Sequence, residues 1–178
     1  MIDLEQAAEA VSAGDTAAFS SIVRATEGRL VRLCARILGG VAEAEEVVQD
    51  AYVKAYRSLV ARSFDRRSTV NTWLYRIVLN AALDAKRARK RVPPPPADLG
   101  QPDAAWDGAA SIEARVALAE LASWLGALPE EQQVVVLLKA VEGFSSAEVA
   151  VILRCSEGAV EQRLVRARAA LRKMGGER

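Results

Sequence analysis

The chain has 178 residues, enough for one ordinary domain or two small ones. Hydrophobic residues make up 51% of it and aromatic residues only 5%, a composition that favours helices over sheets. Because the formal net charge is only +1, the chain as a whole gives no electrostatic argument for a nucleic-acid partner.

Histidine is absent from the sequence, which excludes histidine-based metal sites, Ser-His-Asp triads and the commonest general base. The two cysteines, Cys34 and Cys155, lie far apart without a CxxC partner, so we expect neither a zinc ribbon nor a disulfide scaffold. No apolar run approaches the roughly 20 residues that span a bilayer, and the opening residues MIDLEQ do not resemble a secretory signal. We therefore expect a soluble, cytoplasmic protein without a cofactor.

Three long helical patterns occupy the first half of the chain, over residues 16–38, 41–59 and 69–91. The first stops at two glycines after residue 38, and the third follows Ser68, which we expect to cap it. The second places one set of apolar residues on a single face: Ala44, Val48, Ala51, Tyr52, Ala55 and Leu59. Because no stretch alternates with period two for long enough to form a strand, the predicted fold class is all-α.

A proline-rich segment, RVPPPPADLGQPDAAWDG, separates this half from the rest. Its proline run cannot donate backbone hydrogen bonds and stiffens into an extended conformation. We predict an N-terminal domain over 1–92, an acidic linker over 93–111 and a C-terminal domain over 112–178. The run could instead be a ligand for another module, but a spacer between two domains is the preferred interpretation.

The charges are segregated along the chain in spite of the small net charge. Residues 61–92 carry nine bases against two acids, and residues 157–178 carry six bases against three acids. The intervening segment and the first 60 residues are acidic. Two basic blocks in a nearly neutral chain predict two separate contacts with one polyanion.

Four helices are expected in the C-terminal domain, over residues 112–126, 129–141, 145–153 and 157–173. Residues 145–148, SSAE, form a capping box, and the turn that follows this helix is Arg154-Cys155-Ser156. A short helix, a tight turn and a basic second helix predict a helix-turn-helix, and a plain helical hairpin with a solvated face is the alternative. Arg154 occupies the turn position usually given to glycine, where a left-handed backbone costs about 1 kcal/mol. Cys155 falls on an apolar position and is expected in the core.

Polar residues gather on one side of the expected helix 69–91. That side carries Arg76, Asn80, Asp84, Arg87 and Arg91, and Lys86 begins the run KRARKR beside them. Asparagine can bind a base edge, and arginine and lysine neutralise phosphates, so this side predicts a nucleic-acid contact. The alternative, that cations merely favour the C-terminus of a helix, explains two or three of them but not six.

The outer side of the expected helix 41–59 carries Glu46, Gln49 and Asp50. Paired carboxylates can act in acid–base catalysis, but no nucleophile, metal-ligand set or phosphate loop accompanies them. From the residues alone, a solvated face and a protein-binding face both remain open.

With these segments assembled, the chain resembles the extracytoplasmic-function group of bacterial RNA polymerase sigma factors. Three segments occur in the family's order: EAEEVVQDAYVKAYRSL, TWLYRIVLNAALDAKRARKR, and the run from LPEEQQ to ALRK. The similarity spans roughly residues 14–91 and 112–173. The resemblance implies a sigma factor that binds core RNA polymerase and directs transcription initiation from particular promoters, with no catalysis of its own. It also implies an anti-sigma factor as a further partner.

The resemblance also implies roles for individual residues. The segment that docks on the clamp helices of the largest polymerase subunit matches Glu46, Val48, Gln49 and Asp50. The segment that recognises and melts the −10 promoter element matches Arg76, Asn80, Lys86, Arg87 and Arg91. The part that reads the −35 element matches Glu161, Gln162, Arg163 and Arg166. Within TWLYRI, Trp73 is expected to anchor the core.

Two segments depart from the family pattern. FDRRST at 64–69 replaces the commoner FRGxS, so the resemblance does not identify which −10 base is captured. GAVEQR replaces GTVKSR, so Glu161 stands where a phosphate-seeking cation is usual and could accept from a cytosine amino group or repel phosphate.

Two other classes of protein remain as alternatives. One is a self-sufficient helix-turn-helix regulator that binds operators as a dimer, and the other is a small helical enzyme or interaction module that uses the Glu46 and Asp50 face. A further hypothesis concerns Asp98, Asp103 and Asp107, whose charges would let the linker imitate nucleic acid in the cationic RNA exit path of polymerase.

Overall fold

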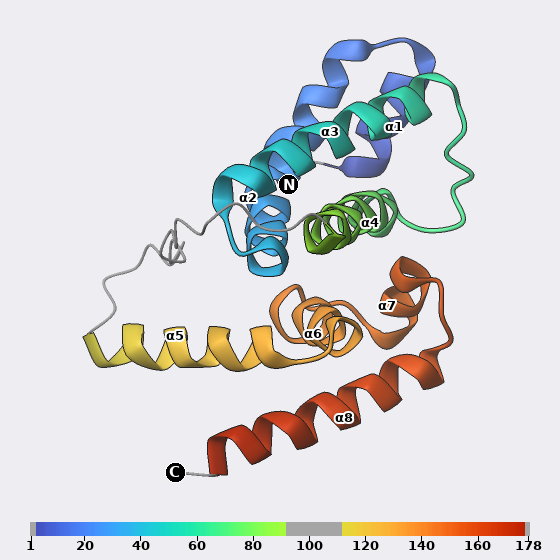
Figure 1. Cartoon of the computed structure of the whole chain (residues 1–178). Coiled ribbons are helices and arrows are strands. Elements are labelled where there is room, and N and C mark those ends of the chain that lie inside the picture. Colours follow the sequence, from blue (N-terminus) through green and yellow to red (C-terminus); the bar gives the residue numbers. More distant parts are fainter. Residues whose placement is uncertain (1–2, 92–111, 177–178) are drawn as a thin grey trace. The chain divides into compact units, whose positions relative to one another are not determined.

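The computed structural model describes residues 3–91 and 112–176, and every regular element within these ranges is helical (Figure 1). The predicted all-α class is therefore confirmed. The chain divides into two compact units, Met1–Asp103 and Ala104–Arg178. The predicted linker over 93–111 lies outside the described residues.

The N-terminal unit contains a helix that the sequence analysis missed. Its elements are α1 (Leu4–Ala13), the short 3₁₀ turn η1 (Thr16–Ala18), α2 (Phe19–Leu38), α3 (Val41–Val60) and α4 (Val70–Arg91). The apolar stripe of α1 is sparse, because only Ala8 and Val11 are buried. Its ends carry the clearer signal: the Asp3 carboxylate accepts hydrogen bonds from the backbone N–H groups of Glu5 and Gln6, and Gly14 closes the helix with φ 110°.

Helices α2, α3 and α4 pack together to form the core of this unit. The six residues buried on α3 are the same six that the sequence pattern predicted. Its alanines let α2 and α3 approach closely, and Gly39, with φ 89°, makes the turn between them. One polar pair lies inside, where the hydroxyl oxygens of Thr26 and Tyr52 are 2.7 Å apart, and burial raises the pKa of Tyr52 to about 12.

The cap of α4 is Thr69 rather than the predicted Ser68. The Thr69 hydroxyl accepts the backbone N–H of Thr72 at 3.2 Å, and its carbonyl accepts the first helical hydrogen bond, from the N–H of Trp73 at 2.9 Å. A cap bonds to the residue three positions into the helix, so a start at Val70 requires the cap to be residue 69.

The C-terminal unit consists of α5 (Ile112–Ala127), α6 (Glu130–Val136), η2 (Leu137–Val141), α7 (Ser146–Leu153) and α8 (Glu157–Gly176). The predicted single helix 129–141 is interrupted, because its last turn η2 has π geometry. The N–H of Glu142 bonds to the carbonyl of Leu137, five residues back, at 3.0 Å. The apolar periodicity did not predict this widened turn, which holds more residues than an ordinary α-helical turn.

Helices α7 and α8 have the local geometry of a helix-turn-helix. The predicted capping box is present: Ser145 and Glu148 exchange side-chain and backbone hydrogen bonds, and the bonds from Ser145 hold the pKa of Glu148 below its ordinary value. Arg154 makes the turn with φ 52° and ψ 47°, the left-handed conformation expected for it. The second helix buries Val160, Leu164 and Ala167, but Leu171 is only half-buried.

We predict that Thr69→Ala destabilises α4 by about 1 kcal/mol, because it removes the cap from the N–H of Thr72. Native-state hydrogen exchange of peptides from α4 measures this loss. Thr69→Ser keeps the hydroxyl and should retain most of the protection. Ser68→Ala is the matched control, and equal losses from the two alanine variants would contradict the assignment of the cap.

Candidate nucleic-acid and partner interface

The outer face of α3 presents three free polar side chains. Glu46, Gln49 and Asp50 are exposed, and within the described ranges none of them has a hydrogen-bond or ion-pair partner. Their spacing of three and four residues places them on one side of the helix, opposite the buried face. This face can therefore bind a partner without breaking any contact that holds the unit together.

A shallow groove lies between α2 and α3 beside this face. Its volume is about 840 Å³, and its lining is mostly apolar: Phe19, Val23, Val31, Val48, Tyr52, Val53 and Tyr56, with Gln49 among the polar residues. Val48 is only 2% exposed and belongs to the core. The residues predicted for polymerase contact thus separate into a buried valine, which shapes the groove, and three polar residues that project from the helix.

Helix α4 carries the second predicted group. Asn80 is exposed, Arg76 is half-buried, and within residues 3–91 neither side chain has a hydrogen-bond or ion-pair partner. Lys86 is half-buried, and Arg87 lies 3.8 Å from Asp84, with both side chains more than half exposed. Arg91 is the last residue of α4, and its side chain lies outside the described part of the chain. The spacing of Arg76, Asn80 and Arg87 places these three residues along one side of the helix.

One cation of the run KRARKR has an internal role. Arg89 forms an ion pair with Glu43 at 2.9 Å and donates to the carbonyl oxygen of Leu38 at 2.8 Å. Because Leu38 ends α2 and Glu43 lies in the first turn of α3, Arg89 joins the far end of α4 to the turn between these helices. It is not free to seek an anionic surface.

Trp73 lies in the core, as predicted. Trp73 is buried, and its ring centroid lies 4.7 Å from that of Phe64 in the loop between α3 and α4. This contact fixes the inner side of that loop.

The third group lies on α8 and falls into two pairs. Gln162 and Arg166 are exposed, four residues apart, and within the described part of the C-terminal unit neither has a hydrogen-bond or ion-pair partner. The Glu161 carboxylate, in contrast, accepts a hydrogen bond from the hydroxyl of Ser146 at the start of α7. Glu161 thus helps to fix the angle between the two helices.

Arg163, predicted to contact DNA, is turned inward. Its guanidinium binds the Glu131 carboxylate of α6 through two nitrogens, each 3.0 Å from Oε2, and a third nitrogen lies 3.4 Å from Sγ of Cys155. The Arg163 side chain is 23% exposed. Cys155 is half-buried beside it rather than in the core as predicted. The pair with Glu131 could not be predicted, because Glu131 lies 32 residues away along the chain.

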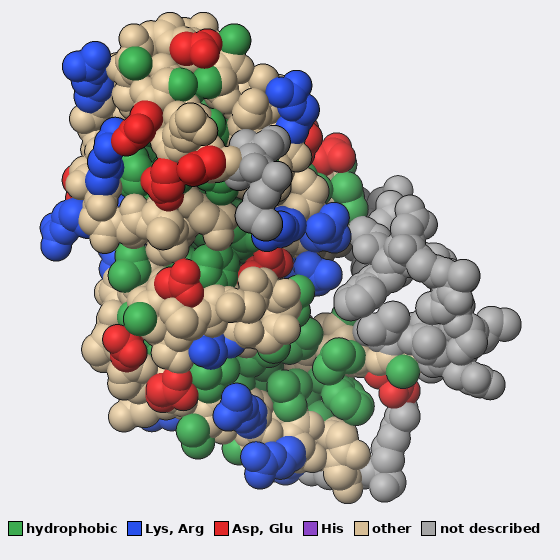
Figure 2. Space-filling view, turned by 180° about the vertical axis from the view of Figure 1, so that it is seen from behind, with side chains coloured by type: hydrophobic (Ala, Val, Ile, Leu, Met, Phe, Trp, Pro, Cys, Tyr) green, Lys and Arg blue, Asp and Glu red, His purple; other side chains and the backbone are tan. Residues whose placement is uncertain are grey.

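Charged residues of both signs are interspersed on the surface. On the face shown in Figure 2, red and blue side chains alternate over the N-terminal unit in the upper half of the view. Across residues 3–91 and 112–176, no cluster of three acidic or cysteine side chains could hold a metal ion. In the same ranges, every helix is too short or too polar to cross a bilayer.

Comparison with protein families assigns both units. Residues 22–92 match the family described as Sigma-70 region 2, and residues 118–171 match Sigma-70, region 4. The two matches include α2–α4 of the first unit and α6–α8 of the second, which are the helices that carry the three groups described above.

Whole-chain similarity agrees with these assignments. The extracytoplasmic-function (ECF) RNA polymerase sigma factor SigW of Bacillus subtilis is 34% identical over 174 residues, covering 92% of this chain and 91% of that protein. The structure of CnrH in complex with the cytosolic domain of CnrY superposes with a TM-score of 0.71 at 31% identity and covers 96% of each chain. The sigma factor RpoE of Bartonella quintana, solved with the anti-sigma factor NepR, shares the fold, with a TM-score of 0.65 at 24% identity over 88% of this chain and 95% of that one.

The chain belongs to the family of ECF RNA polymerase sigma factors. Proteins of this family are DNA-binding transcription initiation factors, and this chain is a promoter-recognising sigma factor.

We predict that Arg163→Ala and Arg166→Ala differ in their effect on stability. Arg163→Ala should lower the free energy of unfolding of the C-terminal unit by about 1 kcal/mol, since it breaks a partly buried ion pair. Arg166→Ala, at an exposed position without a partner in that unit, should change it by less than about 0.5 kcal/mol. Urea denaturation followed by hydrogen exchange of α7 and α8 peptides distinguishes the two. Glu131→Ala should reproduce the loss seen in Arg163→Ala.

We predict that the native chain has one reactive thiol. Cys34 is fully buried, and burial raises the pKa of its thiol to about 12, so it should not react with a disulfide reagent at pH 8 until the unit unfolds. Cys155 is half-buried on the helix-turn-helix and should react in the native state. The measurement is thiol titration with and without denaturant. A Cys155→Ser chain that still reacted quickly when folded would contradict this assignment.

Proposed function

We propose that the two units divide promoter recognition between them. The N-terminal domain (1–92) would bind polymerase and the −10 element, the linker (93–111) would set the distance, and the C-terminal domain (112–178) would bind the −35 element. The observation that carries this proposal is the free polar surface of α3, α4 and α8: each helix presents exposed side chains that have no partner within the described residues of their unit. Groups left free by the fold are available to other molecules.

The polymerase contact is assigned to Glu46, Gln49 and Asp50 on α3. A carboxylate pair flanked by an amide can bind basic and polar groups of a partner helix, and the adjacent groove offers apolar surface to the same partner. Val48 contributes by shaping the groove wall. The proposed partner element is the clamp-helix coiled coil of the largest polymerase subunit, as the family resemblance implies.

The −10 contact is assigned to α4 and the loop before it. Asn80 has a donor and an acceptor for a base edge, while Arg76, Lys86, Arg87 and Arg91 supply positive charge for phosphates. A base of the non-template strand must leave the stack to be read in this way. Contacts between protein and base then offset part of the cost of unpairing the DNA.

The −35 contact is assigned to α8, and its four predicted residues have different roles. Gln162 and Arg166 are exposed and can reach base edges or phosphates in a major groove. Glu161 and Arg163 are engaged with Ser146 and Glu131, so their first effect would be to hold α8 at the correct angle. An arginine with free donors can still approach phosphate from its outer edge.

The chain itself would perform no bond chemistry, which belongs to polymerase. We also propose an anti-sigma factor as an inhibitory partner. Support comes from the structure of CnrH, which was solved as a complex with the cytosolic domain of CnrY. The groove between α2 and α3 is an apolar surface that such a partner could cover.

The double variant Gln49→Ala/Asp50→Ala tests the polymerase contact. We expect association with core RNA polymerase to weaken at least about tenfold, because central polar contacts of an interface often contribute more than 1 kcal/mol each. Association is measured by titrating labelled chain with core enzyme in the absence of DNA. Glu157→Gln, which removes one exposed charge from the other unit, is the control and should bind like the parent chain.

The same assay separates the sigma-factor mechanism from that of a stand-alone regulator. We expect the free chain to bind bare promoter duplex weakly and with strong salt dependence, because its formal net charge is only +1. Run-off transcription with core enzyme should then start at defined promoters. Tight duplex binding without polymerase, together with unchanged association of the double variant, would contradict the proposal and favour the dimeric regulator.

A further inference from the structure

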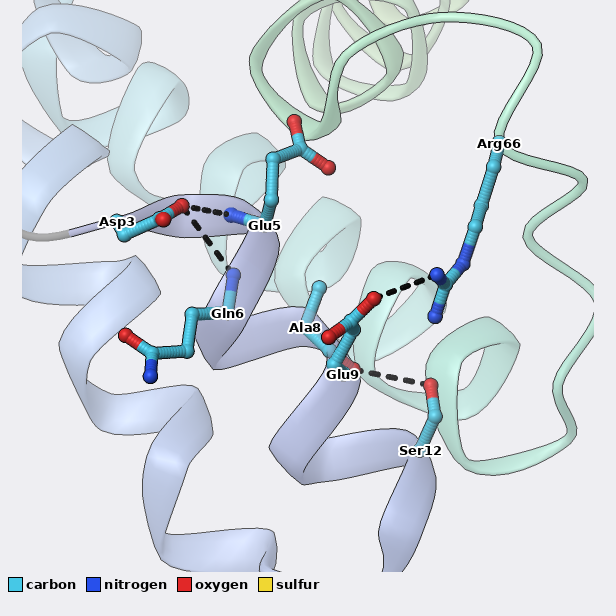
Figure 3. Close-up of polar contacts among 7 residues, drawn as sticks. All are labelled: Asp3, Glu5, Gln6, Ala8, Glu9, Ser12 and Arg66. Carbon is cyan, nitrogen blue, oxygen red and sulfur yellow. Dashed lines mark hydrogen bonds and ion pairs between the residues drawn. The ribbon is translucent and has the colours of Figure 1, made fainter.

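Four polar contacts join helix α1 to the end of α3, to the loop that follows it and to the first residue of α4. The Glu5 carboxylate accepts the backbone N–H of Val70 at 2.7 Å, and the Glu9 carboxylate binds the Arg66 guanidinium at 2.6 Å. The Ser12 hydroxyl donates to the carbonyl oxygen of Leu59 at 3.1 Å, and Nε of Arg62 donates to the carbonyl oxygen of Ser12 at 3.1 Å. Glu5, Glu9 and Ser12 lie along one side of α1, and Glu9 faces Arg66 across the gap to the loop (Figure 3).

The loop held in this way has an unfavourable backbone. Arg62 and Arg66 have φ values of 53° and 54°, in the left-handed region that residues with a Cβ rarely adopt. Such residues keep this conformation only where the surrounding structure fixes them, and they concentrate at functional sites. Both arginines are the ones whose side chains bind α1. The contacts with α1 therefore oppose the tendency of the loop to relax.

The loop is fixed on its inner side as well. Phe64, midway between the two arginines, packs its ring against the buried Trp73 of α4. A cavity of about 320 Å³ lies between α1 and the loop, and its lining includes Glu5, Glu9, Ser12, Phe64 and Arg66. The contacts with α1 and with Trp73 thus leave a preformed hollow rather than a collapsed loop.

We infer that Glu5 and Glu9 are positioning residues for promoter recognition: they hold the α3–α4 loop in its DNA-accepting conformation before DNA arrives. This inference rests on the proposed assignment of the −10 contact to this loop and α4. A loop that is already ordered loses less conformational freedom when DNA binds. Because most molecules then hold the loop in the conformation that binds DNA, the apparent affinity for DNA is not reduced. The helix missed by the sequence analysis would then contribute to base discrimination without contacting the base.

The first measurement uses the free full-length chain and does not depend on sigma activity. Glu5→Ala/Glu9→Ala removes both carboxylates and leaves a residue that favours helix in α1. We expect hydrogen exchange of the peptide spanning residues 61–71 to become at least about threefold faster, while exchange in α2 and α3 is unchanged. Gln6→Ala is the matched control, because Gln6 lies on the same helix with its side chain directed away from the loop (Figure 3). Glu5→Gln keeps an acceptor for Val70 and should restore most of the protection at the start of α4.

The second measurement compares promoters that differ only in the −10 element. With core polymerase and the double variant, we expect the preference for the best −10 base over the other bases to fall about threefold, with the −35 preference and core association unchanged. A variant that was merely less stable would lose activity on all promoters by the same factor and keep its preference. In an Arg66→Ala background, Glu9→Ala should have no further effect, because Glu9 acts through Arg66.

Two results would overturn the inference: unchanged exchange in the loop of the double variant, or faster exchange with the same −10 preference as the parent chain. Failure of the proposed −10 assignment has a different signature. In that case the parent chain itself would show no preference among −10 bases in transcription, regardless of the hydrogen-exchange rate of the loop.

Discussion

The close packing of α3 against α2 is the constraint on which the rest of the N-terminal unit depends. Ala44, Ala51 and Ala55 are completely buried, so the helix backbones approach closely and no room is left for a charged group on that side. Every charged residue of α3 must therefore lie away from this contact. The polar face and the apolar groove beside it are two results of one packing arrangement, and a partner that used both would bind against a rigid surface.

Three arginines of this chain are engaged within the fold, and we expect them to contribute little to DNA binding. Arg66, Arg89 and Arg163 each pair with a carboxylate at least 32 residues away along the chain, so their charge stabilises the fold. Other arginines of the described residues, among them Arg76 and Arg166, have no such partner. Two weakly cationic surfaces become selective when a third body holds them at the correct separation, since each raises the effective concentration of the other.

Periodicity predicted the helices and their inner faces, because burial repeats every three to four residues and leaves a regular trace in the sequence. The buried set of α3 was predicted completely. Helix α1 was missed because only Ala8 and Val11 mark its buried side. The partners of Arg163 and Glu161 could not be predicted either, because they depend on where α6 and α7 lie in space. The family resemblance predicted the site segments, and the structure then separated side chains without a partner from engaged ones.

The burial of Cys34 has a practical consequence for fluorescent labelling of this protein. The chain contains just two sulfhydryls, and only the one beside Arg163 lies within reach of solvent. A fluorophore coupled there would report from the bend of the DNA-reading motif, with no sequence change required. The unmodified protein thus has a labelling site from which a fluorophore can report promoter binding in real time.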